Sequence, residues 1–315
     1  MGGSDFMGSS SGAEGIAWQA DHVAANNAPA TSRVVRAQLA LLDGTTEVGR
    51  TLRDWPKNNQ AAVLEGAVPL RLAGGLHHLH LTGAEDALWP VYRGEVTDQA
   101  AVDALVAGVV ARHDDALLGW FDSPPQTNEA GRSASFMAGL LWLSAHGIGP
   151  RFALNELGAS AGINTMMERY YYDLGGVRAG PAASPMRIRP EWRGSPPPVA
   201  PVDIVSIKGC DQMPQNLADP ASALRIKSYV WPENLDRIAR MDAAIALAAE
   251  CAPDVVQADA ADWVEALLAE PQEDGIVRVI HHSIVWQYIP TPAQHRITHA
   301  IETAGASATA ERPLV

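Results

Sequence analysis

Carboxylate side chains follow three short apolar runs that have the length of buried strands. Glu156 ends the first run, Phe152–Leu157, and a loop of small residues comes directly after it. Asp211 follows the second run, and Asp259 follows the third. Because open parallel sheets bind ligands outside the carboxyl ends of their strands, we expect these three carboxylates to gather at one edge of a sheet.

The loop after the first run has the composition of a ligand-binding turn. Gly158, Ser160 and Gly162 allow a sharp turn and a close approach of a ligand to the backbone. A helix is expected from Thr165, just after Asn164, with its N-terminal N–H groups and positive dipole end facing the ligand. The pattern predicts a nucleotide-binding corner, and the alternative is a plain turn rich in small residues.

The two aspartates suggest how a nucleoside would be held. A carboxylate at the end of the second strand can accept hydrogen bonds from both ribose hydroxyls, which favours Asp211, with Asp203 as the weaker alternative. Asp259, with Ala260 beside it, is placed to accept a hydrogen bond from an adenine amino group.

A fourth run, Ile276–Ile280, leads into the most chemically rich segment of the chain. His281 and His282 are candidate general bases because the reference pKa of histidine lies near neutrality. Tyr288 is grouped with them as a catalytic candidate, and Trp286 as a substrate-binding one. Strand residues alternate between faces, so only one of the two histidines is expected to face the cleft.

A second polar cluster precedes the first strand. Gln126, Asn128, Glu129 and Arg132 are interpreted as substrate-binding residues at the entrance to the ligand-binding domain. The alternative interpretation is a linker followed by a capped helix. Tyr171, in a long insertion over residues 170–201, is expected to shape the same pocket.

The elements that position these residues indicate an α/β protein with an all-helical N-terminal part. We expect a disordered leader over residues 1–15, a helical domain over 16–121, a linker and helix over 122–150, and a ligand-binding domain over 151–315. Residues 306–309 are expected to begin a fifth strand. Three histidines near one helix end, His77, His78 and His80, lack the partners of a metal site, so no metal is predicted.

Composition excludes several classes of function. The 315-residue chain has a formal net charge of −13 and no basic run, which argues against nucleic acid as a partner. Two cysteines cannot form a disulfide framework, which favours a cytoplasmic location. No apolar stretch has the length of a membrane span, and the N-terminus does not have the pattern of a signal peptide.

Four segments together resemble a known family: Gln126–Glu129, Glu156–Asn164, Tyr229–Pro232 and Ser283–Pro290. This family is bacterial and labelled only as a domain of unknown function, and it looks like a divergent branch of the class I, Rossmann-like, S-adenosylmethionine-dependent methyltransferases. The resemblance implies a Rossmann-like sheet flanked by helices. The Asn/Asp-Pro-Pro-Tyr motif of amino-methylating enzymes is absent, and no sequence is left for the C-terminal hairpin that usually completes such a sheet.

The resemblance implies an S-adenosylmethionine-dependent methyltransferase with a small-molecule acceptor. The residues expected to bind the cofactor are Glu156, Gly158, Ser160, Gly162, Asn164, Asp211, Asp259 and Ala260. One alternative is an NAD(P)-dependent oxidoreductase, against which the missing third glycine counts. The other is a non-catalytic protein that binds a ligand or partner on a degenerate fold of this type.

Overall fold

The computed structural model describes residues 12–55, 66–126 and 128–315, and these form two compact units. The first contains the described residues up to 126 together with Leu224–Ile238, and the second contains Asn128–Ala223 and Ala239–Val315. The expected boundary near residue 121 therefore differs from the observed one, and a short later segment returns to the first unit. Residues 1–11 of the expected leader lie outside the described residues, whereas residues 12–15 are helical.

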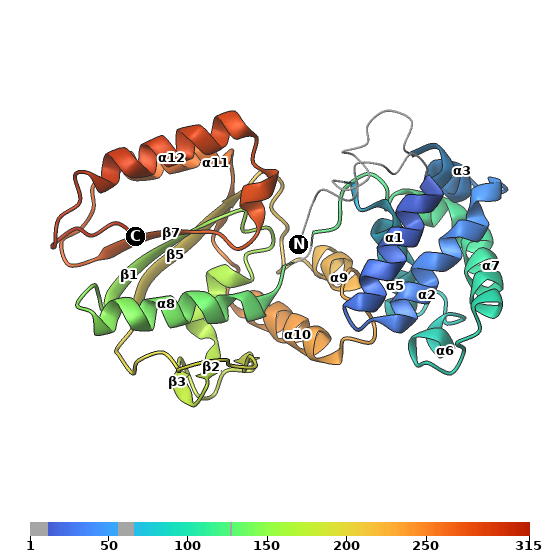
Figure 1. Cartoon of the computed structure of the whole chain (residues 1–315), viewed down its shortest axis with the longest axis horizontal. Helices are drawn as coiled ribbons and strands as arrows, with labels where there is room; N and C mark the ends of the chain where they lie inside the picture. The colour runs from blue at the N-terminus through green and yellow to red at the C-terminus, as the bar shows by residue number, and fades with distance from the viewer. Residues whose placement is uncertain (1–11, 56–65, 127) are drawn as a thin grey trace. The chain divides into compact units, whose positions relative to one another are not determined.

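The first unit is built from helices (Figure 1). They pack around a main apolar core and a smaller apolar cluster that contains Ile16 and Ala20 of the first helix. Its elements are α1 (Gly12–Ala25), α2 (Pro29–Ala37), η1 (Gln38–Asp43), α3 (Glu47–Asp54), α5 (Val68–Leu81), α6 (Trp89–Tyr92) and α7 (Gln99–Leu118). Asp98 caps α7 by accepting a hydrogen bond from the N–H of Ala101 at 2.9 Å. Val102, Val106 and Val109 then fall on one face of the helix and are fully buried, as their helical spacing predicts.

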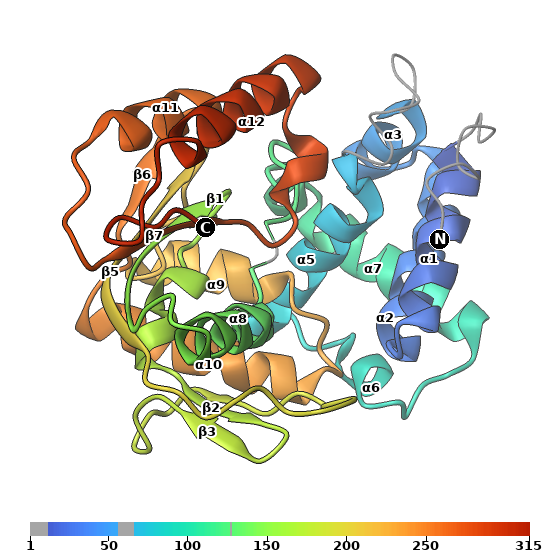
Figure 2. The same ribbon diagram turned by 60° about the vertical axis from the view of Figure 1, so that its left-hand side comes forward.

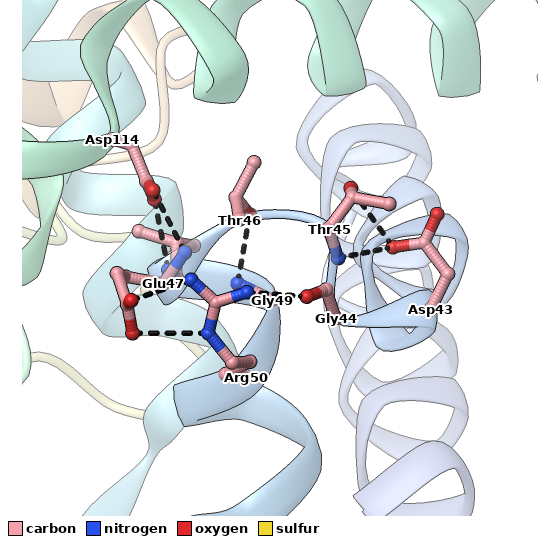
Figure 3. Close-up of polar contacts among 9 residues, drawn as sticks. Asp43, Gly44, Thr45, Thr46, Glu47, Gly49, Arg50 and Asp114 are labelled. Atoms are coloured by element: carbon pink, nitrogen blue, oxygen red, sulfur yellow. Dashed lines mark hydrogen bonds and ion pairs between the residues drawn. The ribbon is translucent and has the colours of Figure 1, made fainter.

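Helix α3 is joined to α7 through its own N-terminus (Figure 3). The Thr46 hydroxyl oxygen accepts a hydrogen bond from the N–H of Gly49 at 3.0 Å. The carboxylate of Asp114, on α7, accepts hydrogen bonds from the N–H groups of Glu47 and Val48 at 2.7 and 2.8 Å. The chain itself therefore satisfies the N–H groups that a helix start leaves unpaired.

The second unit contains a four-stranded sheet in which all neighbouring strands are parallel. Its strands are β1 (Arg151–Leu157), β5 (Asp203–Asp211), β6 (Val255–Gln257) and β7 (Val277–His281), in the spatial order β6-β5-β1-β7. Numbered as the chain enters the sheet, this is the order third, second, first, fourth. The expected fifth strand at residues 306–309 is wrong: those residues form a turn, and it is Leu314 that pairs in parallel with Arg278 of β7.

Helices cover both faces of this sheet. The helical elements in this part of the chain are η3 (Ala130–Arg132), α8 (Ser133–Ala145), α9 (Pro220–Ser228), α10 (Leu235–Glu250), α11 (Ala260–Ala269), η5 (Val285–Tyr288) and α12 (Thr291–Gly305). Most of α9 lies in the segment Leu224–Ile238, which belongs to the first unit. Helices α11 and α12 lie on one face and α8 on the other, as Figures 1 and 2 show. On the α11 side, Leu157 and Cys210 pack with Val264 and Ile297 in a small apolar core.

A second, smaller sheet occupies part of the insertion that follows β1. It contains β2 (Tyr171–Leu174), β3 (Val177–Ala179) and β4 (Arg187–Ile188), and it lies below α8 in Figure 1. The Tyr172 hydroxyl donates to the carbonyl of Met167 at 3.1 Å and contacts the hydroxyl of Ser133 on α8 at 3.0 Å. Part of the long insertion over residues 170–201 is therefore strand, anchored by a buried tyrosine.

Candidate functional site at the carboxyl edge of the parallel sheet

The loop after β1 turns through three residues with positive φ. Gly158, Ser160 and Gly162 have φ angles of 65°, 54° and 71°. A serine is rare in this conformation, and its N–H is held by Asp211, whose Oδ2 accepts at 2.9 Å. A Cβ on Gly158 would lie 2.4 Å from a side-chain carbon of Val285, so only glycine allows that approach.

The two aspartates that are predicted to bind a nucleoside are held by hydrogen bonds from backbone N–H groups. Asp211 also accepts a hydrogen bond from the N–H of Met213 at 2.8 Å. Asp259 caps α11, accepting from the N–H groups of Ala261 and Asp262 at 2.9 and 3.2 Å. Two backbone N–H groups therefore orient each of these side chains. Since a carboxylate offers about four acceptor positions, each can still accept a hydrogen bond from another donor.

The structure brings several predicted residues to one cavity of about 120 Å³. Its described lining includes Gly158, Asp211, Asp259, Ala260 and Tyr288, which come from the ends of β1, β5 and β6 and from η5. This volume is somewhat smaller than the apolar cavity of about 150 Å³ that binds benzene.

Glu156 is buried on the α8 side of the same sheet edge, with 1% of its surface exposed. Its Oε1 accepts a hydrogen bond from the side-chain amide of Asn164 at 3.2 Å, and its Oε2 has no hydrogen-bond partner among the described residues. Burial raises the pKa of Glu156 to about 8, although the Asn164 hydrogen bond and the charge of Arg132 oppose the rise. The group is therefore mostly protonated at neutral pH and would ionise beside a bound cation.

His281 is the last residue of β7 and the register partner of Glu156, so the two side chains share a face of the sheet. It is buried against the ring of Phe136 at 4.3 Å, and neither ring nitrogen has a hydrogen-bond partner in the described part of the chain. Burial, with a smaller contribution from His282, lowers the pKa of His281 to about 4. His282 is exposed and stacks on Trp286, with ring centroids 5.5 Å apart.

The N–H groups of the loop face the protein. The N–H of Gly162 donates to the carbonyl of Ala159 at 2.8 Å, and the N–H of Ile163 donates to the side-chain oxygen of Asn128 at 2.8 Å. A Cβ on Gly162 would lie 2.4 Å from the Cβ of Pro253, so a proline fills the space expected for a ligand. Asn128, predicted to bind substrate, is thus buried and holds the loop in place.

The helix expected after this loop is not an α-helix. Asn164–Arg169 forms a six-residue 3₁₀-helix, η4, and the chain then enters β2. Its end is packed by Tyr170, which is fully buried and donates to the carbonyl of Ile163. The expectation of free helix N–H groups facing a ligand is therefore wrong, because the turn is too short and the loop amides have internal acceptors.

Several other predicted residues lie outside the described lining of the cavity. Tyr171 lies in the small sheet, under the guanidinium of Arg187 at 4.8 Å. Glu129 pairs with Arg240 at 2.8 Å, and Gln126 belongs to the first unit. Others outside this lining are Glu156, Ser160, Gly162, Asn164, Asn128, Arg132, His281, His282 and Trp286.

The sequence did not single out part of the observed lining: Cys210, Gln212, Ala258, Val285, Ile289 and Pro290. Cys210 and Gln212 flank Asp211, which was expected to follow its strand but is the last residue of β5. An expected strand end at Asp211 would have identified both neighbours. The apolar members carry no such signal, because their position depends on how η5 packs.

The described residues contain neither a metal-binding cluster nor a membrane-spanning helix. Within residues 12–55, 66–126 and 128–315, no group of three or more His, Cys, Asp or Glu side chains is arranged to hold a metal ion. His77 and His78 contact Ser228, and His80 contacts Asp86. In the same ranges, every helix is too short or too polar to cross a bilayer.

Comparison with known proteins gives one match. Residues 13–315 match the family described as "Uncharacterized protein conserved in bacteria (DUF2332)". Searches of the curated proteins and of the solved structures found no match. Since the family match spans nearly the whole chain, the protein belongs to this uncharacterised bacterial family.

Proposed function

We propose that this protein is an S-adenosylmethionine-dependent methyltransferase that acts on a small molecule, built on a Rossmann-like sheet. The observation that carries the proposal is that Gly158, Asp211 and Asp259, from the ends of three successive strands, line one cavity. The strand order third, second, first, fourth is also that of the first four strands of the six-stranded doubly wound order 3-2-1-4-5-6.

The residues at this edge suit the cofactor. Asp211 would hold the ribose hydroxyls, and Asp259 the adenine amino group, because both carboxylates are already oriented by backbone contacts. The unpartnered Oε2 of Glu156 suits a positively charged ligand. When bound, S-adenosylmethionine supplies an electrophilic methyl group. His281, His282 and Tyr288 are the candidates to take the proton that the acceptor loses.

The loop favours this cofactor over NAD(P). A dinucleotide diphosphate is bound by unpaired N–H groups of a glycine loop and of the helix that follows it. Here the N–H groups of Ser160, Gly162 and Ile163 already have internal acceptors, and η4 is short. A sulfonium compound has no phosphate and does not need such a cradle.

Calorimetric titration of the full chain with S-adenosylmethionine, S-adenosylhomocysteine and NADH tests the proposal. We expect the first two to bind and NADH not to bind. Binding of NADH alone would support an oxidoreductase instead. Failure of all three to bind would favour the non-catalytic alternative.

A matched pair of variants places the site. Ala260→Leu adds bulk to the cavity lining at the first turn of α11, whereas Ala269→Leu adds it at the exposed far end of the same helix. We expect Ala260→Leu to weaken S-adenosylmethionine binding by at least about tenfold and Ala269→Leu to leave it unchanged. Equal affinities for the two variants would exclude this cavity as the cofactor site.

A further inference from the structure

A second group of polar side chains lies at the carboxyl edge of the parallel sheet, on the side that faces α8. Phe136, in the first turn of α8, contacts the ring of His281 at the end of β7, with centroids 4.3 Å apart. Arg132, directly before α8, donates a hydrogen bond to the hydroxyl of Ser283 at 3.5 Å. All four residues belong to the second unit and lie outside the described lining of the proposed cofactor cavity.

The positive charge of Arg132 has no counter-ion among the residues that the structure describes. The residue is half-buried, and its hydrogen bond to Ser283 has a length at the outer limit for such bonds. The neighbouring acidic groups are paired or uncharged: Glu129 pairs with Arg240 at 2.8 Å, and burial raises the pKa of Glu156 to about 8. A partly desolvated guanidinium that is not neutralised favours an anionic ligand.

His281 adds an unsatisfied polar side chain at the same place. It is 9% exposed, and neither ring nitrogen has a hydrogen-bond partner in the described part of the chain. A neutral imidazole carries one N–H donor and one acceptor, and buried polar groups without partners call for a ligand, an ion or a water. The N-terminal end of α8, at Ser133, adds a partial positive charge to that of Arg132.

From the unneutralised charge of Arg132, the hydroxyl of Ser283 and the unpartnered imidazole of His281, we infer that this side of the sheet edge binds a carboxylate group of the methyl acceptor. A carboxylate has about four acceptor positions, enough for two N–H groups of a guanidinium and one hydroxyl. The substrate class is therefore small carboxylic acids. Naming the ligand as the acceptor rests on the proposed function.

Two observations favour the acceptor over the methionine part of the cofactor as the source of this carboxylate. The lining of the proposed cofactor cavity lies on the other face of the sheet, where Cys210 and Val285 pack with α11. Ser283 is also only two residues from His281, a candidate to take the acceptor's proton. A carboxylate held by Arg132 and Ser283 keeps the rest of the acceptor close to this imidazole.

NMR titration of the full chain tests this inference with probes of equal length: propionate, propionamide and propylammonium. We expect propionate to bind, propionamide to bind at least about tenfold more weakly because it is uncharged, and propylammonium not to bind. Equal affinities for propionate and propionamide, or no binding of propionate, would overturn the inference.

Variants locate the binding. Arg132→Met keeps the apolar stem and removes the charge, so it should abolish the preference for propionate over propionamide, whereas Arg132→Lys should retain it. Arg178→Met removes an exposed charge from β3 of the same unit and should leave the preference unchanged. Ser283→Ala should weaken propionate binding. A preference that persists in Arg132→Met would refute the inference, and if that variant does not fold, wild-type affinity in Ser283→Ala would do so.

S-adenosylhomocysteine and methylthioadenosine distinguish the two sources of the carboxylate, because methylthioadenosine lacks the amino-acid part. We expect Arg132→Met to bind both compounds as the wild type does. Weaker binding of S-adenosylhomocysteine alone in this variant would assign Arg132 to the cofactor and contradict the inference. If neither compound binds to the wild type but propionate does, the proposed function fails while the carboxylate site remains.

Discussion

Glu156 and His281 stand side by side in the register of β1 and β7, and burial leaves both largely uncharged near neutral pH. Each also has an unpartnered polar atom among the described residues. Such atoms are costly in a folded protein unless a ligand, water or ion satisfies them. Their position between the first and fourth strands is where open α/β sheets bind ligands. This pair is thus the strongest residue-level indication of a binding function.

Glu156 should make the free energy of unfolding depend on pH. Its pKa is about 8 in the folded protein and near 4.5 when unfolded, so between these values the folded state holds one more proton than the unfolded state. Stability then falls as pH rises through this window, by up to about 1.4 kcal/mol per pH unit. Buried His77 and His281, with pKa values lowered to about 4, act in the opposite direction below about pH 6.5. The contribution of Glu156 is therefore the difference in the free energy of unfolding between the wild type and Glu156→Gln, measured by urea unfolding, and we expect this difference to fall as pH rises through the window.

The matched control for this measurement is Glu191→Gln. Glu191 is a surface carboxylate with 80% of its side chain exposed, and its partner Arg193 is equally exposed. We expect this variant to retain the wild-type pH dependence. If Glu156→Gln retained it as well, the buried carboxyl would not be the group responsible.

At the scale of elements, the sequence predicts the parallel strands well and their surroundings poorly. The predicted runs Phe152–Leu157 and Ile276–Ile280 overlap β1 and β7 almost completely, because continuous apolar runs mark strands buried on both faces. The turn η4 and the strand β2 were missed. The pair Gly175-Gly176 is a hairpin signal, but the strands beside it are short and gain their stability from buried tyrosines such as Tyr172.

The same contrast applies to the site. Asp211 and Asp259 were identified because they follow strands, and both line the cavity. Asn128 was assigned to substrate, yet its side chain holds the loop at Ile163. A polar residue that binds a ligand and one that binds the backbone look alike in a sequence, since only the folded chain decides which donors lie within reach.

Helix α3 offers a test of how two helices of the first unit are joined. Asp114→Ala removes the acceptor of two helix N–H groups, and we expect it to lower the free energy of unfolding by about 1–2 kcal/mol. Asp115→Ala removes the adjacent exposed carboxylate and should change stability little. Chemical denaturation of both variants provides the comparison, and equal stabilities would show that the cap contributes nothing measurable.

At the scale of the whole molecule, the two units have separate apolar cores, and the chain divides its residues between them out of sequence order. Tyr229 belongs to the core of the first unit although residues on both sides of Leu224–Ile238 belong to the second. Domain boundaries predicted from a sequence are placed at linkers. Such a prediction misses a segment that returns to the first unit, because the composition of a short apolar segment does not indicate which core it packs into.

The protection of backbone amides from hydrogen exchange should therefore depend on which core a segment packs into, and not on its position in the sequence. Leu72→Ala opens a cavity in the first core and Leu154→Ala one in the second unit, each at a site with 1% or less exposure. Either change should cost about 2–5 kcal/mol. We expect amides of residues 224–238 to lose protection in Leu72→Ala, together with α5 and α7, while the parallel sheet is spared. In Leu154→Ala the sheet should lose protection and residues 224–238 should keep theirs. If residues 224–238 lost protection in Leu154→Ala and kept it in Leu72→Ala, the segment would be stabilised by the second core and its assignment to the first would be wrong.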